Sequence, residues 1–114
     1  MKIKAQKKGV EGFENVVTLS DVVSYQKDAV VSREIVRRGS GNITLFAFDE
    51  AQGLSEHTAP YDAVVVVVDG EAHVKIAGVL QHVKKGQMIV MPAHKPHSLI
   101  AKKRFKMMLV MIRG

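Results

Sequence analysis

The chain has 114 residues and no cysteine, which predicts a single domain over residues 1–114 and excludes disulfides, cysteine-based zinc sites and thiol nucleophiles. Its formal charge of +6 is unevenly spread, because residues 1–71 hold all eleven acidic side chains and only eight basic ones, whereas residues 72–114 hold nine basic side chains and no acid. No apolar run approaches the roughly 20 residues of a transmembrane helix, and no apolar stretch follows the basic N-terminus to form a signal peptide. We therefore expect a cytoplasmic protein that does not enter a membrane.

The first part of the chain gives weak structural signals. Residues 1–10 are rich in lysine, and we expect them to be disordered or to form an arm. Residues 19–23 give a short indication of helix, with Ser20 as the candidate N-cap. From about residue 29 the pattern changes to short runs of β-branched and aromatic residues, which are typical of strands. Two such runs, 29–36 and 43–48, flank Gly39-Ser40-Gly41-Asn42, which predicts a hairpin with a four-residue loop.

The middle of the chain is dominated by five consecutive valines at positions 64–68. Valine disfavours helix and the run does not alternate with polar residues, so we predict a strand that is buried on both faces. A barrel core on one face and a dimer interface on the other would account for this burial. The Asp69-Gly70 pair that follows predicts a two-residue hairpin turn into a strand at 71–76. Ala77-Gly78 predicts a second turn, before a strand at 79–83.

The last third predicts three more short strands, at 88–91, 97–101 and 105–112. The final two are joined by a basic turn whose charges are Lys102, Lys103 and Arg104, followed by Lys106. Such a cluster forms either a nucleic-acid patch or a solvated turn. We favour the solvated turn, because two Tyr, four Phe and no Trp leave few rings for stacking on bases. Many short, evenly spaced strands predict an all-β barrel or sandwich.

Two stretches have the spacing of the two cupin motifs. The first cupin motif runs His-x-His, three or four residues, Glu, six residues and Gly; it fits within residues 53–70, with His57 as its first histidine and Gly70 as its closing glycine. The second runs Gly, five residues, Pro-x-Gly, two residues, His, three residues and Asn, and it fits residues 86–101 through Gly86, Pro92 and His97. Over about residues 40–112 the chain thus resembles the small conserved-barrel cupins. The resemblance implies a double-stranded antiparallel β-barrel of the cupin, or jelly-roll, type and a homodimer.

The departures from the family pattern fall on the metal ligands. The resemblance implies four of them: two histidines and a glutamate in the first motif, and the histidine of the second. Ala59 and Ala63 stand in place of the second histidine and the glutamate, so only His57 and His97 remain. His94 occupies the position of the glycine that follows Pro92, where a positive φ is often needed and which His tolerates.

The candidate site follows from these positions. We predict a ligand pocket made by His57, Tyr61, His94 and His97. A divalent metal would be held by His57 and His97, with Asp62 or His94 as a third ligand; imidazole and carboxylate suit Fe(II), Mn(II), Ni(II) or Zn(II). Asp62 faces away on a regular strand, so it needs a bulge near Pro60 to point inward. Losing two of four ligands should remove most of the metal affinity, so a pocket without metal is the competing interpretation.

Two functions are compatible with this sequence. The first is a small-molecule-binding barrel with a weakened metal site, acting without catalysis as a sensor or carrier. The alternative is a metal-dependent oxygenase or isomerase that acts on a small polar metabolite. Two further residues, His73 and Arg33, each allow two interpretations. His73 faces either the cavity or solvent, and we favour solvent; Arg33 either pairs with an anionic substrate or is exposed or at a dimer contact, and we favour the latter.

Overall fold

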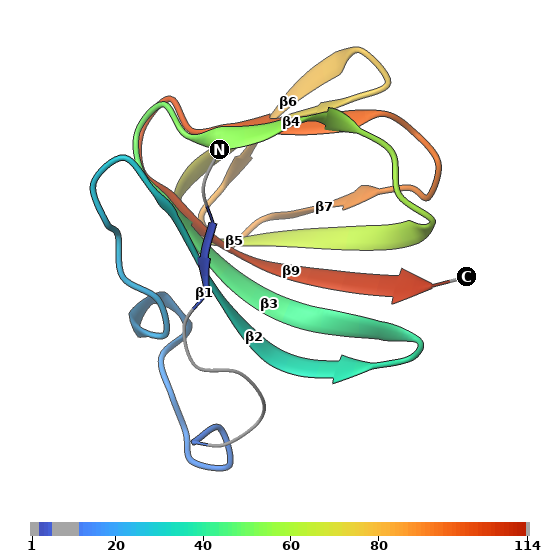
Figure 1. The fold of residues 1–114 in the computed structure, drawn as a ribbon. Helices are drawn as coiled ribbons and strands as arrows, with labels where there is room; N and C mark the ends of the chain where they lie inside the picture. The colour runs from blue at the N-terminus through green and yellow to red at the C-terminus, as the bar shows by residue number, and fades with distance from the viewer. Residues whose placement is uncertain (1–2, 6–11, 114) are drawn as a thin grey trace.

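The computed structural model describes residues 3–5 and 12–113, and nearly all of their regular secondary structure is strand (Figure 1). In chain order the elements are β1 Ile3–Ala5, the short 3₁₀ helix η1 Leu19–Asp21, β2 Val30–Arg38, β3 Gly41–Phe48, β4 Gly53–His57, β5 Tyr61–Ile76, β6 Val79–Lys84, β7 Met88–Met91, β8 His97–Ile100 and β9 Phe105–Arg113. The strands curl into a partly open barrel and pair antiparallel, except that β1 runs parallel to β2. The predicted all-β cupin-type barrel is confirmed.

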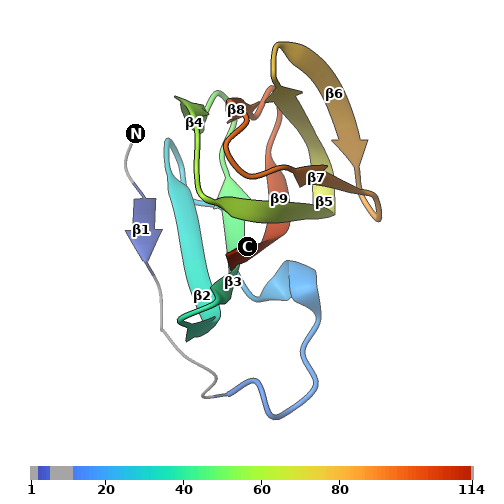
Figure 2. The same cartoon turned by 90° about the vertical axis from the view of Figure 1, so that its right-hand side faces the viewer.

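Strand β5 joins the two halves of the barrel. Its first part pairs with β9 and β7, and its second part pairs with β6 and β8. The order of neighbours is β1-β2-β3-β9-β5-β8-β4, with β6 and β7 attached to β5. In Figure 1, β4 and β6 lie above the layer formed by β2, β3 and β9, and Figure 2 shows the same curl from the side. One long strand therefore turns the corner between both layers.

The predicted hairpin at Asp69-Gly70 is wrong, because β5 continues through this dipeptide to Ile76. Its pairing with β9 shifts register between Val67 and Asp69, and Gly70 has a φ of +71°. A bulge next to a left-handed glycine bends a strand without reversing it. The reversal comes at the second predicted turn, Ala77-Gly78, whose φ values are +47° and +83°.

The other early predictions differ in detail. The β2–β3 loop has two residues, not four, because Gly41 and Asn42 already pair with Arg38 and Arg37 of β2. The helix at 19–23 is a single 3₁₀ turn in which Ser20 lies inside the element; Thr18 is its N-cap and makes no side-chain capping bond. Ile3–Ala5 lies beside β2, whereas residues 1–2 and 6–10 of the proposed N-terminal arm lie outside the described residues.

The barrel interior holds the main core. Phe48 and Phe105 are fully buried and stack with ring centroids 4.6 Å apart at an interplanar angle of 8°, a favourable aromatic geometry. In the valine strand, Val65 and Val67 are fully buried on the inner face, while Val64 and Val66 on the outer face are half-buried. Within one chain, the predicted full burial is therefore confirmed for the inner face only.

The N-terminal segment covers the outside of the β2–β3 hairpin. Val22 and Val23 pack on Val31, Leu45 and Ala47 of that hairpin to form a second, smaller core. Polar contacts close the edges of this packing: the Tyr25 hydroxyl donates to Asp69 at 2.5 Å, and Lys106 donates to the Ser20 carbonyl at 2.5 Å. The bend in β5 and the start of β9 are thus both connected to the N-terminal segment.

Asp49 ties the basic turn to the start of β2. Its carboxylate accepts hydrogen bonds from Arg104 Nε at 2.7 Å and from the Asp28 backbone N–H at 2.7 Å. The Arg104 hydrogen bond, followed by the backbone donors, lowers the pKa of Asp49 to about 2. Arg104 therefore forms its ion pair within the chain.

No helix among the described residues is long and apolar enough to cross a membrane.

The bend at Gly70 should be intolerant of any side chain. A Cβ there would lie 2.3 Å from the Arg104 carbonyl oxygen, whereas a Cβ at Gly78 meets nothing within 4 Å. Both glycines have positive φ, so Gly78→Ala should cost about 1–2 kcal/mol of unfolding free energy from the left-handed backbone alone. Gly70→Ala should cost about 1–3 kcal/mol more, from the backbone clash. Urea denaturation followed by circular dichroism measures both; equal losses would contradict this view of the bend.

Candidate functional site

His57 and His97 face each other across two paired strands. His57 ends β4, His97 begins β8, and the two residues are direct partners in the antiparallel ladder. Their Nε2 atoms lie 3.1 Å apart, with the rings at 70° to each other. His97 is buried, whereas His57 is exposed. The pair therefore has one ring in the barrel wall and one ring toward its mouth.

The other ring nitrogen of each histidine contacts a backbone carbonyl. His57 Nδ1 lies 2.7 Å from the Ser55 oxygen, and His97 Nδ1 lies 3.0 Å from the Lys95 oxygen. A carbonyl oxygen only accepts hydrogen bonds, so we assign the proton of each neutral ring to Nδ1. Each Nε2 then carries a lone pair, and two acceptors face each other at short distance. The contact between the two Nε2 atoms becomes favourable only when an added proton, a ligand donor or a cation lies between the rings.

The local environment disfavours the added proton. Burial lowers the pKa of His97 below its ordinary value, the Lys95 carbonyl partly opposes this shift, and the nearby His57 ring lowers the pKa further. Burial therefore favours the neutral form of the His97 ring, whose Nε2 is an acceptor. This arrangement suits a hydrogen-bond donor or a metal ion arriving from outside the protein.

A small apolar cavity lies beside the pair. Its volume is about 40 Å³, which holds one water-sized group and is well below the roughly 300–1,000 Å³ of pockets for drug-sized ligands. Apart from the two histidines, its lining is apolar and consists of Leu54, Ala59, Ala63, Met91, Leu99, Met107, Leu109 and Met111. A ligand held by the histidines would place an apolar group against leucine and methionine side chains.

The residues at this site do not fit the four-ligand metal centre that the cupin motifs imply. Ala59 and Ala63, at the positions of two missing ligands, line the cavity, and no carboxylate appears among its described lining residues. The described residues contain no group of three His, Asp or Glu ligand atoms that includes His57 or His97. The site therefore offers two nitrogen ligands and leaves all further ligands to come from elsewhere.

The remaining predicted site residues lie outside the cavity lining. The Tyr61 hydroxyl accepts from Arg113 Nη2 at 2.9 Å, and Asp62 Oδ1 accepts from the Ala93 N–H at 2.9 Å. His94 is exposed and has the positive φ expected at the family's glycine position, +68°. A role for Tyr61 or His94 in ligand binding, and for Asp62 or His94 as a third metal ligand, stays a prediction.

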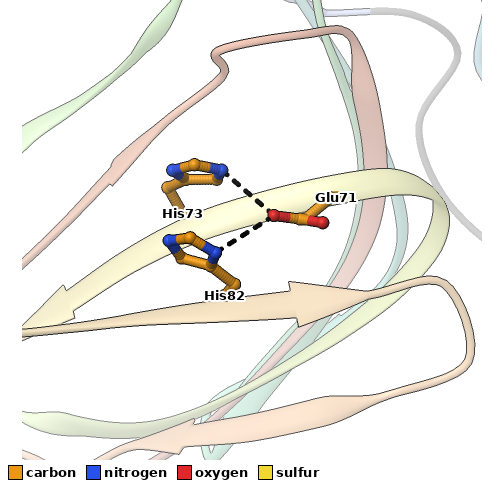
Figure 3. A group of neighbouring side chains, drawn as sticks. All are labelled: Glu71, His73 and His82. Atoms are coloured by element: carbon orange, nitrogen blue, oxygen red, sulfur yellow. Dashed lines mark ion pairs between the residues drawn. The ribbon is translucent and has the colours of Figure 1, made fainter.

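A second cluster of potential ligands, which the sequence analysis did not identify, lies on the β5–β6 hairpin (Figure 3). Glu71 Oε2 lies 3.2 Å from His73 Nε2 and 3.3 Å from His82 Nδ1. As favoured, His73 lies outside the cavity lining and on the outer face of β5, but only 11% of its side chain is exposed. The available signal was the Ala77-Gly78 turn, because a two-residue loop there pairs His73 with His82.

Comparisons with known proteins agree with this fold. A family model described as "Cupin domain" matches residues 44–113. A conserved protein of unknown function from Streptococcus pyogenes is 37% identical, with 88% of each chain covered and a TM-score of 0.84. A cupin 2 conserved barrel domain protein from Leptotrichia buccalis is also 37% identical (TM-score 0.80), and 82% of this chain covers 46% of that one.

A third solved structure shows the fold alone. A cupin superfamily protein from Desulfitobacterium hafniense is 24% identical, with 89% of this chain and 93% of that chain covered and a TM-score of 0.84. Among curated proteins, none matches this chain. The matching family model and the two relatives at 37% identity therefore show the family. The chemistry of the site has to be argued from this chain's own residues.

The lowered pKa of His97 predicts a loss of stability in acid. Below the ordinary histidine pKa of about 6.5 the unfolded chain takes up a proton that folded His97 resists, so the unfolding free energy falls as pH decreases. This residue contributes at most about 1.4 kcal/mol per pH unit. Urea denaturation between pH 8 and pH 5 should show a steeper loss for the wild type than for His97→Gln. Parallel curves for the two proteins would contradict this prediction.

Proposed function

We propose that this chain, which belongs to the cupin family, is a small-molecule-binding barrel with a weakened metal site, and that His57 and His97 hold its ligand. One observation carries the proposal: the two Nε2 atoms lie 3.1 Å apart while each Nδ1 is engaged by a carbonyl. Two acceptors without a donor between them are costly in a partly buried site. A ligand that supplies the donor removes this cost.

The chemistry of the surroundings narrows the class of ligand. A hydroxyl, ammonium or amide N–H of the ligand would donate to the histidine pair, and an apolar end would enter the cavity. Because the cavity measures about 40 Å³, the apolar end is small unless a lining side chain moves. Met111 is half-buried near the end of β9, and an unbranched thioether side chain adapts readily to a new neighbour. Small polar metabolites with a short apolar part fit these conditions.

The alternative is a metal-dependent oxygenase or isomerase, and one observation favours it. Two ligands at right angles on an ion with bonds of about 2.0–2.1 Å lie about 2.9 Å apart, and the two Nε2 atoms lie 3.1 Å apart. Fe, Mn, Ni or Zn are the candidate ions. Since Ala59 and Ala63 supply no ligand, solvent or substrate would have to fill the other positions, and the affinity would be low.

The ligand proposal is tested by a thermal-shift screen. Metal-free protein in EDTA is screened against small alcohols, amines and carboxamides, and separately, without EDTA, against Zn, Mn, Fe and Ni salts. We expect an organic compound to raise Tm. His57→Ala should weaken its binding about tenfold or more, because one hydrogen bond in a partly buried site is lost.

The matched control is His82→Ala, which changes an exposed histidine on β6 outside the cavity lining and, in EDTA, should bind the same organic compound as tightly as the wild type does. His57 is exposed, so its replacement should leave the circular dichroism spectrum unchanged. Stabilisation by a metal salt alone, lost in His57→Ala, would overturn the proposal in favour of the metal-dependent alternative. An organic compound that binds equally well to His57→Ala would place its site elsewhere.

We also propose that the protein is a cytoplasmic homodimer, and the outer face of the valine strand supports the dimer. Val64 and Val66 are half-buried there, and their neighbours on β7, Val90 and Met88, are 42% and 56% exposed. These four side chains form the outer valine patch. Light scattering during gel filtration should give about twice the chain mass of 12.5 kDa.

The charge of a glutamate in the middle of the outer valine patch should separate the two chains. Val66→Glu should elute as a monomer, because burying an unpaired carboxylate is costly. Leu80→Glu, which changes a 52% exposed residue on β6, is the control and should keep the mass of the wild type. A monomeric wild type would exclude the dimer.

A further inference from the structure

We infer that Glu71, His73 and His82 form a second metal site, for a zinc-like divalent ion, on the β5–β6 hairpin. Figure 3 shows the two imidazole rings side by side with the carboxylate at one end of both. The cluster uses none of the residues of the histidine pair or its cavity. The inference is therefore independent of the proposed small-molecule ligand.

The distances match a shared ion. The three ligand atoms, Glu71 Oε2, His73 Nε2 and His82 Nδ1, all lie within 4.8 Å of one another. Zinc binds nitrogen and oxygen at about 2.0–2.2 Å, so neighbouring ligands of a tetrahedral ion are about 3.3–3.5 Å apart. The two distances from the Glu71 oxygen to the histidine nitrogens are 3.2 and 3.3 Å. Two histidines and a carboxylate are also a donor set that catalytic zinc sites use.

The backbone holds these side chains in place. His73 and His82 are direct partners in a continuous ladder that runs from Glu71–Lys84 to Ile76–Val79. Glu71 and His73 are two residues apart on one strand and so share a face of the sheet. The two rings stack with centroids 4.1 Å apart at 20°. Three ligands on a closed hairpin lose little conformational freedom when an ion binds.

A metal ion explains the cluster better than an ion pair does. An ion pair with Glu71 requires a protonated ring, and two protonated rings stacked at 4.1 Å would repel each other. At most one of the two histidine rings can therefore form an ion pair with the Glu71 carboxylate. A single divalent cation attracts the carboxylate and both ring lone pairs together, with no protonation of either histidine.

Access to the cluster is open on one side. Glu71 and His73 line a hollow of about 250 Å³ together with Lys102 and Lys103 of the turn before β9. An ion with three protein ligands keeps a fourth position for water or another small ligand. The two lysine charges next to the hollow favour an anion at that position.

The inference is tested by titrating metal-free protein with Zn²⁺ in a calorimeter, in a His57→Ala background so that the histidine pair cannot contribute. We expect saturable binding of about one ion per chain. Adding His82→Ala should weaken it about tenfold or more, and so should Glu71→Gln, which keeps the shape and removes the charge. His82 is 51% exposed, so its loss should leave the fold intact, as circular dichroism can check.

The matched control is Gln81→Ala, an exposed neighbour of His82 on the same strand that is not part of the cluster and should bind Zn²⁺ unchanged. Either of two results overturns the inference: no saturable binding in the His57→Ala background, or equal affinity in the His82→Ala, Glu71→Gln and Gln81→Ala proteins. Neither result bears on the histidine pair, because that pair is already disabled.

Discussion

The bend of β5 at Gly70 is the constraint on which both the histidine pair and the Glu71–His73–His82 cluster depend. Before the bend, β5 carries Ala63, which lines the cavity and pairs with Met91 and Met111, two other lining residues. After the bend, the same strand carries Glu71 and His73 and pairs with β8, on which His97 is the partner of Ile76. A glycine in the left-handed region, with the Arg104 carbonyl in the space of its missing side chain, makes this change of sheet possible. The histidine pair and the hairpin cluster are thus placed by one backbone feature.

Much of the fold follows from the sequence, because its information is local. His57, Gly86 and Pro92 lie where strands end, and the Ala77-Gly78 turn sets the register of β5 and β6. Asp69-Gly70 could not be interpreted correctly in the same way. Its residue types favour a turn, yet the bulge opposite β9, more than thirty residues away, keeps the chain in one strand. Contacts distant in sequence override local turn chemistry at this point.

The candidate site was predictable to the same extent. Motif spacing predicts that His57 and His97 share one site, and the two lie across one ladder position. It could not show that Asp62 is held by the Ala93 N–H or that Tyr61 contacts Arg113, because these contacts depend on how the chain turns around Pro60 and Pro92. The Glu71–His73–His82 cluster lies outside both motifs, so only the hairpin register reveals it. Replacement of the family's ligands by Ala59 and Ala63 leaves an apolar cavity beside two acceptors, which supports the proposed site for a small molecule.

The proposed ligand site requires that both Nε2 atoms of the histidine pair lack a proton, and imidazole NMR tests this requirement most directly. Long-range ¹H–¹⁵N spectra of the metal-free, ligand-free protein near pH 8 distinguish the two tautomers of each ring. We expect Nδ1–H in both His57 and His97, in agreement with their carbonyl partners. An Nε2–H in either ring would mean that the two histidines form a direct hydrogen bond with each other. That result would contradict the proposal that a ligand supplies the missing donor.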